Sequence, residues 1–478
     1  MNYKMIRNIL GWLLLFEAGF MLVPLITGLC YAEAEVWAFA VAILICAAMG
    51  GLCVWRKPKD PVLYAREGFV IVALSWIALS LFGAIPFCIS GAIPNYLDAV
   101  FETVSGFTTT GASILSEVES LPRCMLMWRS FTHWVGGMGV LVFIMAFIPL
   151  SGGQNMHIMK AESPGPSVSK LVPRVKTTAL ILYSIYIVMT LVMFVLLLFG
   201  DVTPFEALNI TFSTAGTGGF GIYNNSLGSF TPYVHVVVTV FMLLFSVNFT
   251  TYYFILIGRL KDAFTSEVSR FLIIVGVVTL AVTLDIRGLF NTFGEALRHG
   301  ALTVASLIST TGFATENYNN WPELSRTLLV LIMFIGACAG STGGGLKISR
   351  LMILFRGAFN EIGRMIYPRR IRRTTIDGHP VENDVVRATN VYIIWYFLIF
   401  AASVVLISFD DYDLITNITA VAATINNVGP GLGSVGPTGN FGFFSAVSKL
   451  VLIFDMLAGR LELFPMLVLF APATWRRS

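Results

Sequence analysis

The chain has 478 residues, of which 56% are hydrophobic and only 12% are charged. Soluble domains are about a quarter charged, so this composition excludes a water-soluble fold of this size. The net charge of +4 is small, and the basic residues stand in short segments between apolar blocks, a pattern that does not support nucleic-acid binding.

Ten apolar blocks are long enough to cross a bilayer, which takes about 20 helical residues. In chain order they cover about residues 9–30, 36–55, 68–90, 130–150, 178–200, 232–258, 270–290, 326–349, 389–409 and 444–472. The first block could pass for a signal peptide, but it contains Glu17 and a second span follows at once, so we expect it to be retained. The pattern predicts an all-α polytopic membrane protein.

Shorter apolar stretches separate spans three and four, five and six, seven and eight, and nine and ten. They are too short to cross, so we expect them to be re-entrant. One side of the membrane then collects the basic residues, namely Lys4, Arg7, Arg56, Lys57, Lys59, Arg66, Lys160, Lys170, Arg174, Lys176, Arg259, Lys261, Arg270, a run from Arg350 to Arg387, Arg476 and Arg477. Because Lys and Arg favour the cytoplasmic side, both termini are predicted to be cytoplasmic.

The four short stretches share one pattern that ends in a glycine. The glycines are Gly111, Gly219, Gly312 and Gly429, and the residues six positions earlier are Ser105, Ser213, Ser306 and Ala423. In the second stretch Gly216 and Gly218 compete, and Gly219 is preferred because it aligns Phe220 with Phe313. Small residues also permit close helix packing, but four stretches in one register favour a repeated unit of helix, re-entrant loop and helix.

The predicted fold therefore has four pseudo-symmetric helix–pore loop–helix repeats around one pore, plus two extra N-terminal transmembrane helices. The expected bounds are 1–60 for the two N-terminal helices, 61–160 for repeat 1, 161–262 for repeat 2, 263–380 for repeat 3 with a basic cytoplasmic loop, and 381–478 for repeat 4.

Glycine loops that meet at one axis suit the dehydration of a cation. A potassium ion sheds water when rings of backbone carbonyls replace it, and glycine permits the positive φ angles that such rings require. Non-helical backbone at membrane depth is tolerated where it lines a watery cavity. The hydroxyls of Thr109, Thr110, Thr310 and Thr311 can brace or extend the rings. The repeat thus predicts a potassium-conducting pore.

A glycine run from Gly340 to Gly345 stands at the end of an apolar block. Each glycine costs a helix about 1 kcal/mol relative to alanine, so we expect an unwound segment, with tight helix packing as the alternative. The run also imitates a phosphate-binding loop, but Leu346 separates it from Lys347 and no strand precedes it, which excludes nucleotide binding here.

Two basic residues, Lys347 and Arg460, fall within or at the ends of predicted spans. A central charge costs about 2.5–3.5 kcal/mol on insertion scales, which usually indicates a cavity. Lys347 could instead snorkel to the cytoplasmic surface, and Arg460 could pair with Asp455 or Glu462. Glu17 and Glu102 receive no predicted role.

No enzymatic or metal-binding constellation is predicted. The cysteines are scattered without paired spacing, and His133 and the other histidines form no ligand pattern. We expect a protein that is not an enzyme and has no cofactor of its own, with potassium as its transported ion.

The sequence resembles, over essentially its whole length, the superfamily of potassium transporters that includes TrkH and KtrB, and the TrkH branch most closely. The resemblance lies in Trp128-Arg129-Ser130, in Gly136-Gly137-Met138-Gly139, in the segment from Gly340 to Lys347, and in Gly459-Arg460-Leu461-Glu462. It implies a multi-pass protein of the bacterial cytoplasmic (inner) membrane, a homodimer among membrane lipid, and a cytosolic nucleotide-binding regulatory subunit of TrkA or KtrA type.

The resemblance also implies site residues. The potassium filter would be formed by Thr109, Thr110, Gly111, Gly218, Gly219, Thr310, Thr311, Gly312, Asn427, Val428 and Gly429, and the gate by Gly340, Gly343, Gly344, Gly345, Lys347 and Arg460. Asn427 and Val428 depart from the threonines of other loops and loosen the four-fold symmetry. An alternating-access symporter coupled to protons or sodium remains the alternative, but the filter stretches contain no acidic residue, which favours a channel-like pathway.

Overall fold

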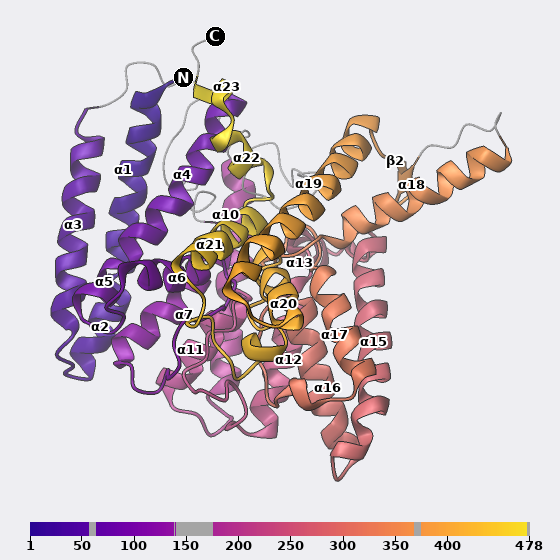
Figure 1. Ribbon diagram of the computed structural model, residues 1–478, viewed down its shortest axis with the longest axis horizontal. Helices are drawn as coiled ribbons and strands as arrows, with labels where there is room; N and C mark the ends of the chain where they lie inside the picture. Colours follow the sequence, from indigo (N-terminus) through magenta and orange to yellow (C-terminus); the bar gives the residue numbers. More distant parts are fainter. Residues whose placement is uncertain (57–63, 138, 140–174, 368–373, 476–478) are drawn as a thin grey trace.

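The protein is an all-α polytopic assembly, and the computed structural model describes residues 1–56, 64–137, 139, 175–367 and 374–475 (Figure 1). Both termini lie at one end of the molecule, the upper end in Figure 1, which we name the terminal side. The fourth predicted span beyond residue 139 lies outside the described residues. So do Lys57, Lys59, Met138, Lys160, Lys170, Arg174, Arg476, Arg477 and part of the basic run, residues 368–373.

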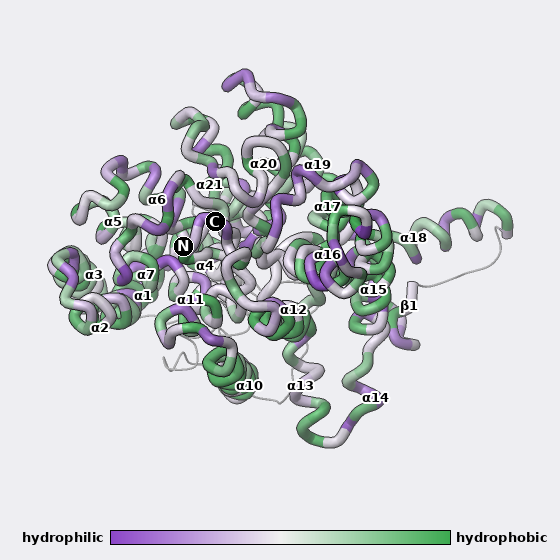
Figure 2. Tube along the Cα trace, turned by 90° about the horizontal axis from the view of Figure 1, so that it is seen from below, coloured by the Kyte–Doolittle hydropathy of each residue, from purple (hydrophilic) through white to green (hydrophobic). Residues whose placement is uncertain are grey.

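The N-terminal unit consists of α1 (Tyr3–Phe20), α2 (Leu22–Cys30) and α3 (Val36–Val54). The side chain of Asn2 caps α1 by accepting a hydrogen bond from the Met5 N–H at 3.1 Å. α1 and α3 approach closely where Gly11 faces Gly50, because a Cβ added to Gly11 would lie 2.9 Å from the Gly50 carbonyl oxygen. Seen along the molecule, these helices form one edge of the assembly (Figure 2).

Four repeats follow, and each contains an outer helix, a short pore helix, a loop and an inner helix. Repeat 1 has α4 (Ala65–Gly83), α5 (Ile85–Ile89), α6 (Tyr96–Phe107) and α7 (Arg123–Gly137). Repeat 2 has α10 (Val175–Leu197), α11 (Pro204–Ala215), α12 (Pro232–Ser246), α13 (Phe249–Leu256) and α14 (Leu260–Ala263). Repeat 3 has α15 (Ser266–Ile286), α16 (Phe293–Ile308), α17 (Glu323–Phe334) and α18 (Ile348–Ile366), and repeat 4 has α19 (Asn383–Ile407), α20 (Leu414–Ile425), α21 (Ala446–Arg460), α22 (Phe464–Phe470) and α23 (Pro472–Trp475).

Short elements complete the described chain. They are the 3-10 turns Arg287–Leu289, Tyr318–Asn320, Ser408–Asp410 and Gly433–Val435, and the antiparallel pair β1 (Thr375–Ile376) and β2 (His379–Pro380).

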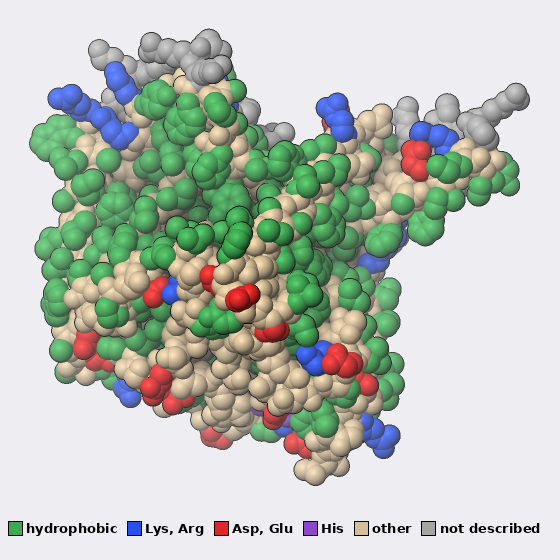
Figure 3. All heavy atoms as spheres, in the orientation of Figure 1, with side chains coloured by type: hydrophobic (Ala, Val, Ile, Leu, Met, Phe, Trp, Pro, Cys, Tyr) green, Lys and Arg blue, Asp and Glu red, His purple; other side chains and the backbone are tan. Residues whose placement is uncertain are grey.

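Apolar side chains cover much of the visible flank of the molecule, while most visible acidic side chains lie on the half away from the termini (Figure 3).

Six of the ten predicted spans are continuous helices in the described residues, and α12 with α13 makes a seventh if the bent pair counts as one. Three predicted spans are broken. α12 and α13 meet at an angle of 91°, the span predicted for 326–349 stops being helical after Phe334, and the span predicted for 444–472 breaks between Arg460 and Phe464. The breaks within 232–258 and 444–472 were not predicted, whereas the loss of helix after Phe334 includes the unwinding predicted for Gly340 to Gly345. All three breaks lie next to the filter described below.

Candidate ion filter and intramembrane loop

The pore helices of the four repeats begin in the same way. The side chains of Asn95, Thr203, Thr292 and Asp413 each accept a hydrogen bond from a backbone N–H in the first turn of α6, α11, α16 and α20. Each helix ends immediately before the predicted filter residues. The carbonyl ends of the helices, which carry partial negative charge, therefore point toward the filter and favour a cation there.

The cap of α11 also provides a pH-dependent contact outside the spans. Glu206 accepts hydrogen bonds from the Thr203 N–H at 2.7 Å and from the Tyr223 hydroxyl at 2.6 Å. Partial burial opposes ionisation of Glu206, but the bonds from Tyr223 and Thr203 outweigh it and lower the pKa of this carboxyl. The same Tyr223 bond, with burial, raises the pKa of Tyr223 to about 12.

We expect Glu206→Gln to lower the melting temperature of the detergent-solubilised protein at pH 7. Because the folded pKa of Glu206 lies below its unfolded value, ionised Glu206 stabilises the fold above the ordinary glutamate pKa of about 4.3. The difference in melting temperature should shrink as pH falls through the folded pKa. A difference that stays constant from pH 7 to pH 3 would contradict the role of the charge.

The four filter loops adopt one backbone path. The N–H groups of Thr110, Gly218, Thr311 and Val428 reach back to the carbonyls of Ser105, Ser213, Ser306 and Ala423 at 2.8–2.9 Å. Positive φ angles recur at the glycine, with φ of 81° at Gly111, 77° at Gly219, 87° at Gly312 and 97° at Gly429. They recur two residues earlier at Thr109, Thr217, Thr310 and Asn427. The structure thus puts Gly219, rather than Gly216 or Gly218, in register with the other three glycines.

The loops contact one another in a closed ring. A Cβ added to Gly111 would collide with the carbonyl oxygen of Gly218, one on Gly219 with that of Thr311, and one on Gly312 with that of Val428. A Cβ on Gly429 would lie 2.6 Å from the carbonyl oxygen of Thr110, which closes the ring. Each glycine therefore makes room for a carbonyl of another repeat, and these contacts link the four loops in a ring.

The side chains of the ring residues are buried and depart from four-fold symmetry. The Thr110 and Thr311 hydroxyls bond to Thr108 and Ser309 at 2.8 and 2.7 Å. In repeat 4 the amide of Asn427 donates to the Thr110 hydroxyl at 2.9 Å and to the Met456 carbonyl at 2.9 Å. The hydroxyls of Thr110 and Thr311 thus brace their own loops, whereas Asn427 ties repeat 4 to repeat 1. The bracing predicted for Thr109 is not seen, because its hydroxyl makes no hydrogen bond within the described residues.

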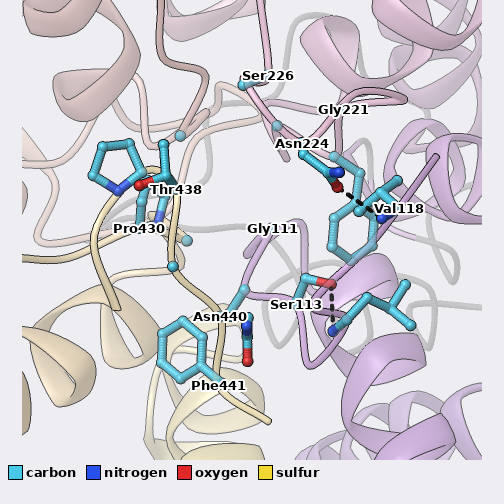
Figure 4. Close-up of a pocket in the computed structure, with 18 of the residues that line it drawn as sticks. Gly111, Ser113, Val118, Gly221, Asn224, Ser226, Pro430, Thr438, Asn440 and Phe441 are labelled. Carbon is cyan, nitrogen blue, oxygen red and sulfur yellow. Dashed lines mark hydrogen bonds between the residues drawn. The ribbon is translucent and has the colours of Figure 1, made fainter. Parts of the chain in front are cut away.

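An open pocket leads to the ring (Figure 4). All four filter glycines line it, together with residues of the loops that follow them, including Ser113, Asn224 and Asn440. Asn224 accepts a hydrogen bond from the Val118 N–H at 2.8 Å, which joins the loops of repeats 1 and 2. Arg129 also lines the pocket, but it is paired with Glu102, and the uncharged polar groups around it suit an incoming hydrated cation.

The glycine run lies against the other end of the filter. Residues 335–347 are not helical, which confirms the predicted unwinding, and Ile335 pairs with Leu346 so that the segment closes on itself. We name residues 335–347 the intramembrane loop. The Gly344 N–H donates to the Thr310 hydroxyl at 2.7 Å, and a Cβ on Gly344 would lie 2.6 Å from the Asn426 carbonyl oxygen. The loop backbone therefore rests directly on the filter residue Thr310 of repeat 3 and on Asn426, which precedes the filter residues of repeat 4.

The broken inner helices anchor this loop. The Cys338 N–H donates to the Ser246 carbonyl at 3.1 Å, where α12 ends, and the Phe249 N–H donates to the Gly340 carbonyl at 3.1 Å, where α13 begins. Arg460, the last residue of α21, donates to the Thr342 carbonyl at 2.7 Å and to the Gly137 carbonyl at 2.8 Å. All four repeats thus meet at the intramembrane loop.

Lys347 and Glu267 each form hydrogen bonds with the backbone of the intramembrane loop. Lys347 is only 1% exposed, and its ammonium donates to the carbonyls of Gly343 and Gly344. The snorkelling alternative for Lys347 is therefore wrong. A carboxylate oxygen of Glu267, in the first turn of α15, accepts from the Ala339 N–H at 2.8 Å and from the Ser349 N–H at 3.1 Å.

The two carboxylates considered as partners for Arg460 have contacts of their own. Glu462 forms an ion pair with Arg350, and Asp455 accepts a hydrogen bond from the Ser403 hydroxyl at 2.8 Å. Sequence reasoning missed Thr217, although its place two residues before Gly219 was a usable signal. It also missed Glu267, whose partners Ala339 and Ser349 lie 72 and 82 residues further along the chain. Glu102 was noted but given no role.

Comparison with known proteins agrees with this geometry. The TrkH family model, described as cation transport protein, matches residues 36–284 and 288–477. The chain is 35% identical over 486 residues to the Trk system potassium uptake protein TrkH of Salmonella typhimurium, with 100% of both chains covered. It is 31% identical over 483 residues to TrkG of Escherichia coli, with 99% of each covered. The crystal structure of the potassium transporter TrkH from Vibrio parahaemolyticus matches with a TM-score of 0.89 and 32% identity over 100% of both chains. The resemblance stated from the motifs is confirmed, and the chain belongs to the TrkH family of cation transport proteins.

Proposed function

We propose that this protein takes up potassium across the bacterial cytoplasmic membrane through the four-carbonyl ring. The observation that carries the proposal is the cyclic contact of the four glycines with the carbonyls of Thr110, Gly218, Thr311 and Val428. Backbone carbonyls replace the hydration shell of potassium without burying a net charge. The names of the relatives, which are potassium uptake proteins and potassium transporters, support the choice of ion.

The intramembrane loop acts as the gate in this proposal. Its support is its place against Thr310 and Asn426 and its attachment by Lys347 and Arg460, the residues expected for gating. A backbone segment with several glycines can rearrange at low steric cost. The gate opens when the loop moves away from the filter, and Lys347 and Arg460 hold it in place until then.

A cytosolic regulatory subunit that binds nucleotide drives this movement, and two copies of the chain form a homodimer. The relatives are named as members of a Trk system, which supports a system of several components. The terminal side faces the cytoplasm in this proposal. It carries both chain ends and the basic residues that favour that side of the membrane.

Uptake into liposomes tests the proposed function. Purified protein should carry rubidium, a potassium substitute, into liposomes with an outward potassium gradient, and should carry sodium far more slowly. Protein-free liposomes give the background. Equal uptake of sodium and rubidium would overturn the proposal. So would rubidium uptake at the level of protein-free liposomes, if it stays at that level when Gly343 to Gly345 of the intramembrane loop are deleted.

Planar-bilayer recording separates the channel-like pathway from a symporter. Unitary currents well above transporter turnover are expected from open carbonyl rings. Flux that requires a proton or sodium gradient and shows no unitary events would favour alternating access.

A further inference from the structure

The outer ends of the first two filter loops are attached to one helix, α7. Arg129 and His133 stand one turn apart on α7 and therefore lie on the same face. This face meets the pore helix α6 of repeat 1 and the loop that follows Gly219 in repeat 2. The proposed ion pathway assigns no role to either side chain.

Arg129 forms a buried ion pair with Glu102 of α6. Its Nε lies 2.8 Å from a Glu102 carboxylate oxygen, and the two residues are 2% and 1% exposed. Buried charges are costly unless they are paired and hydrogen-bonded. An ion pair kept at this depth therefore requires partners on all sides, and the surrounding loops supply them.

Glu102 holds the loop of repeat 1. Its carboxylate accepts hydrogen bonds from the Ile114 N–H at 3.0 Å and from the Ser113 hydroxyl at 2.9 Å. The Ser113 oxygen in turn accepts from Arg129 at 3.3 Å. These residues stand two and three positions after Gly111, so the ion pair sets where the first loop leaves the filter.

Arg129 and His133 hold the loop of repeat 2. Arg129 donates to the Gly221 carbonyl at 3.1 Å, and its guanidinium carbon lies 4.1 Å from the centre of the Phe220 ring. The Phe220 N–H donates to His133 Nε2 at 3.2 Å. Because Nε2 accepts, Nδ1 must carry the proton that it donates to the Gly106 carbonyl at 2.7 Å. Residues of α7 thus contact both the ring and the backbone N–H of Phe220, which directly follows Gly219.

We propose that Glu102, Arg129 and His133 form a strut that positions the filter at the boundary of repeats 1 and 2 and thereby sets the preference for potassium over sodium. The inference rests on the proposed potassium conduction. Functional geometry has to be held within about 0.5 Å by such supporting contacts. The loops after the filter at the other three boundaries use neutral hydrogen bonds, from Leu227 to Ala314, from Gly433 to Asn319 and from Phe441 to Ser113. The ion pair of Lys449 with Asp98, between repeats 4 and 1, joins the first turns of α21 and α6 and does not bond to a filter loop. The charged strut is the stiffer restraint because hydrogen bonds between ionised groups are stronger.

The test is the potassium-to-sodium permeability ratio of Glu102→Gln in planar bilayers. Loss of a charge-assisted contact should lower the ratio by about tenfold. Arg129→Lys should have a similar effect, because lysine keeps the charge but lacks the fork that reaches both loops. Asp285→Asn is the matched control, since it makes the same carboxyl-to-amide change where α15 holds Ser325 of α17.

Melting temperature and elution as a single species report folding independently of selectivity. If Glu102→Gln does not fold, Ser113→Ala removes only the hydroxyl between the ion pair and the first loop, and it should still lower the ratio. If the wild type is selective and a folded strut variant keeps the same potassium-to-sodium permeability ratio, the strut proposal is wrong and the proposed function stands. A wild type that does not distinguish potassium from sodium overturns the proposed function instead.

Discussion

Replacing Gly111 with serine should lower the potassium-to-sodium permeability ratio by about tenfold or more, which corresponds to at least about 1.4 kcal/mol of lost discrimination. Gly111 has a φ of 81°, a conformation that side chains rarely adopt. A Cβ at this position would collide with the Gly218 carbonyl oxygen. Serine must therefore displace the Gly218 carbonyl, one of the four that form the proposed potassium filter. Reversal potentials under mixed potassium and sodium gradients measure the ratio.

The matched control is Gly276→Ser in α15. No heavy atom outside its own helix lies within 4 Å of a Cβ built on Gly276, so the same substitution should leave the ratio unchanged. A folded Gly111→Ser protein with wild-type selectivity would refute the filter assignment.

The filter register could be predicted from the sequence because it depends on local backbone chemistry. In each loop the N–H of the residue before the glycine bonds to the carbonyl of residue 105, 213, 306 or 423. This recurring bond explains why the spacing from that residue to the glycine is the same in all four loops. The competition among Gly216, Gly218 and Gly219 was harder, since all three lack a side chain. In the structure, the φ of 77° and the collision with the Thr311 carbonyl distinguish Gly219 from its neighbours.

The helix breaks could not be predicted from hydropathy. An apolar block such as 232–258 has the composition of a continuous span, yet α12 ends at Ser246 because its carbonyl groups find donors in the intramembrane loop. Such partners come from another repeat, and sequence distance hides them. At the break after Arg460 the Leu463 N–H bonds to the Ala458 carbonyl of the same repeat, and Glu462 and Leu463 adopt positive φ angles of 66° and 60°. Unwound backbone is tolerated at this depth where neighbouring protein satisfies it.

The burial of the Lys347 side chain could not be predicted from hydropathy either. Its position near the end of a predicted span left snorkelling open, because hydropathy gives depth along the membrane normal and says nothing about lateral contacts. Its burial follows from the loop that folds back over it, so that the carbonyls of Gly343 and Gly344 accept hydrogen bonds from its ammonium group. These hydrogen bonds from the buried lysine restrain the backbone of the intramembrane loop, so removing the two carbonyls should loosen the loop.

Deleting Gly343 to Gly345 should raise basal rubidium flux in liposomes by roughly tenfold or more. The deletion removes the Gly344 bond to Thr310 and the two carbonyls that hold Lys347, and three such bonds contribute about 1 kcal/mol each. If these contacts favour the closed loop, their loss shifts the equilibrium toward the open pore by the same free energy. Flux without any regulatory subunit measures the effect.

Lys347→Met tests the same contacts without shortening the chain. Methionine fills a similar volume but donates no hydrogen bond, so flux should rise less than in the deletion, because the Gly344 bond to Thr310 remains. Lys261→Met, at an exposed lysine of α14, is the control and should leave flux unchanged. If flux falls in both loop variants while melting temperature and elution stay normal, the loop supports the filter as a scaffold. A rise in both, ordered by the number of contacts removed, requires that the loop obstructs the pore, since a scaffold that loses contacts weakens conduction.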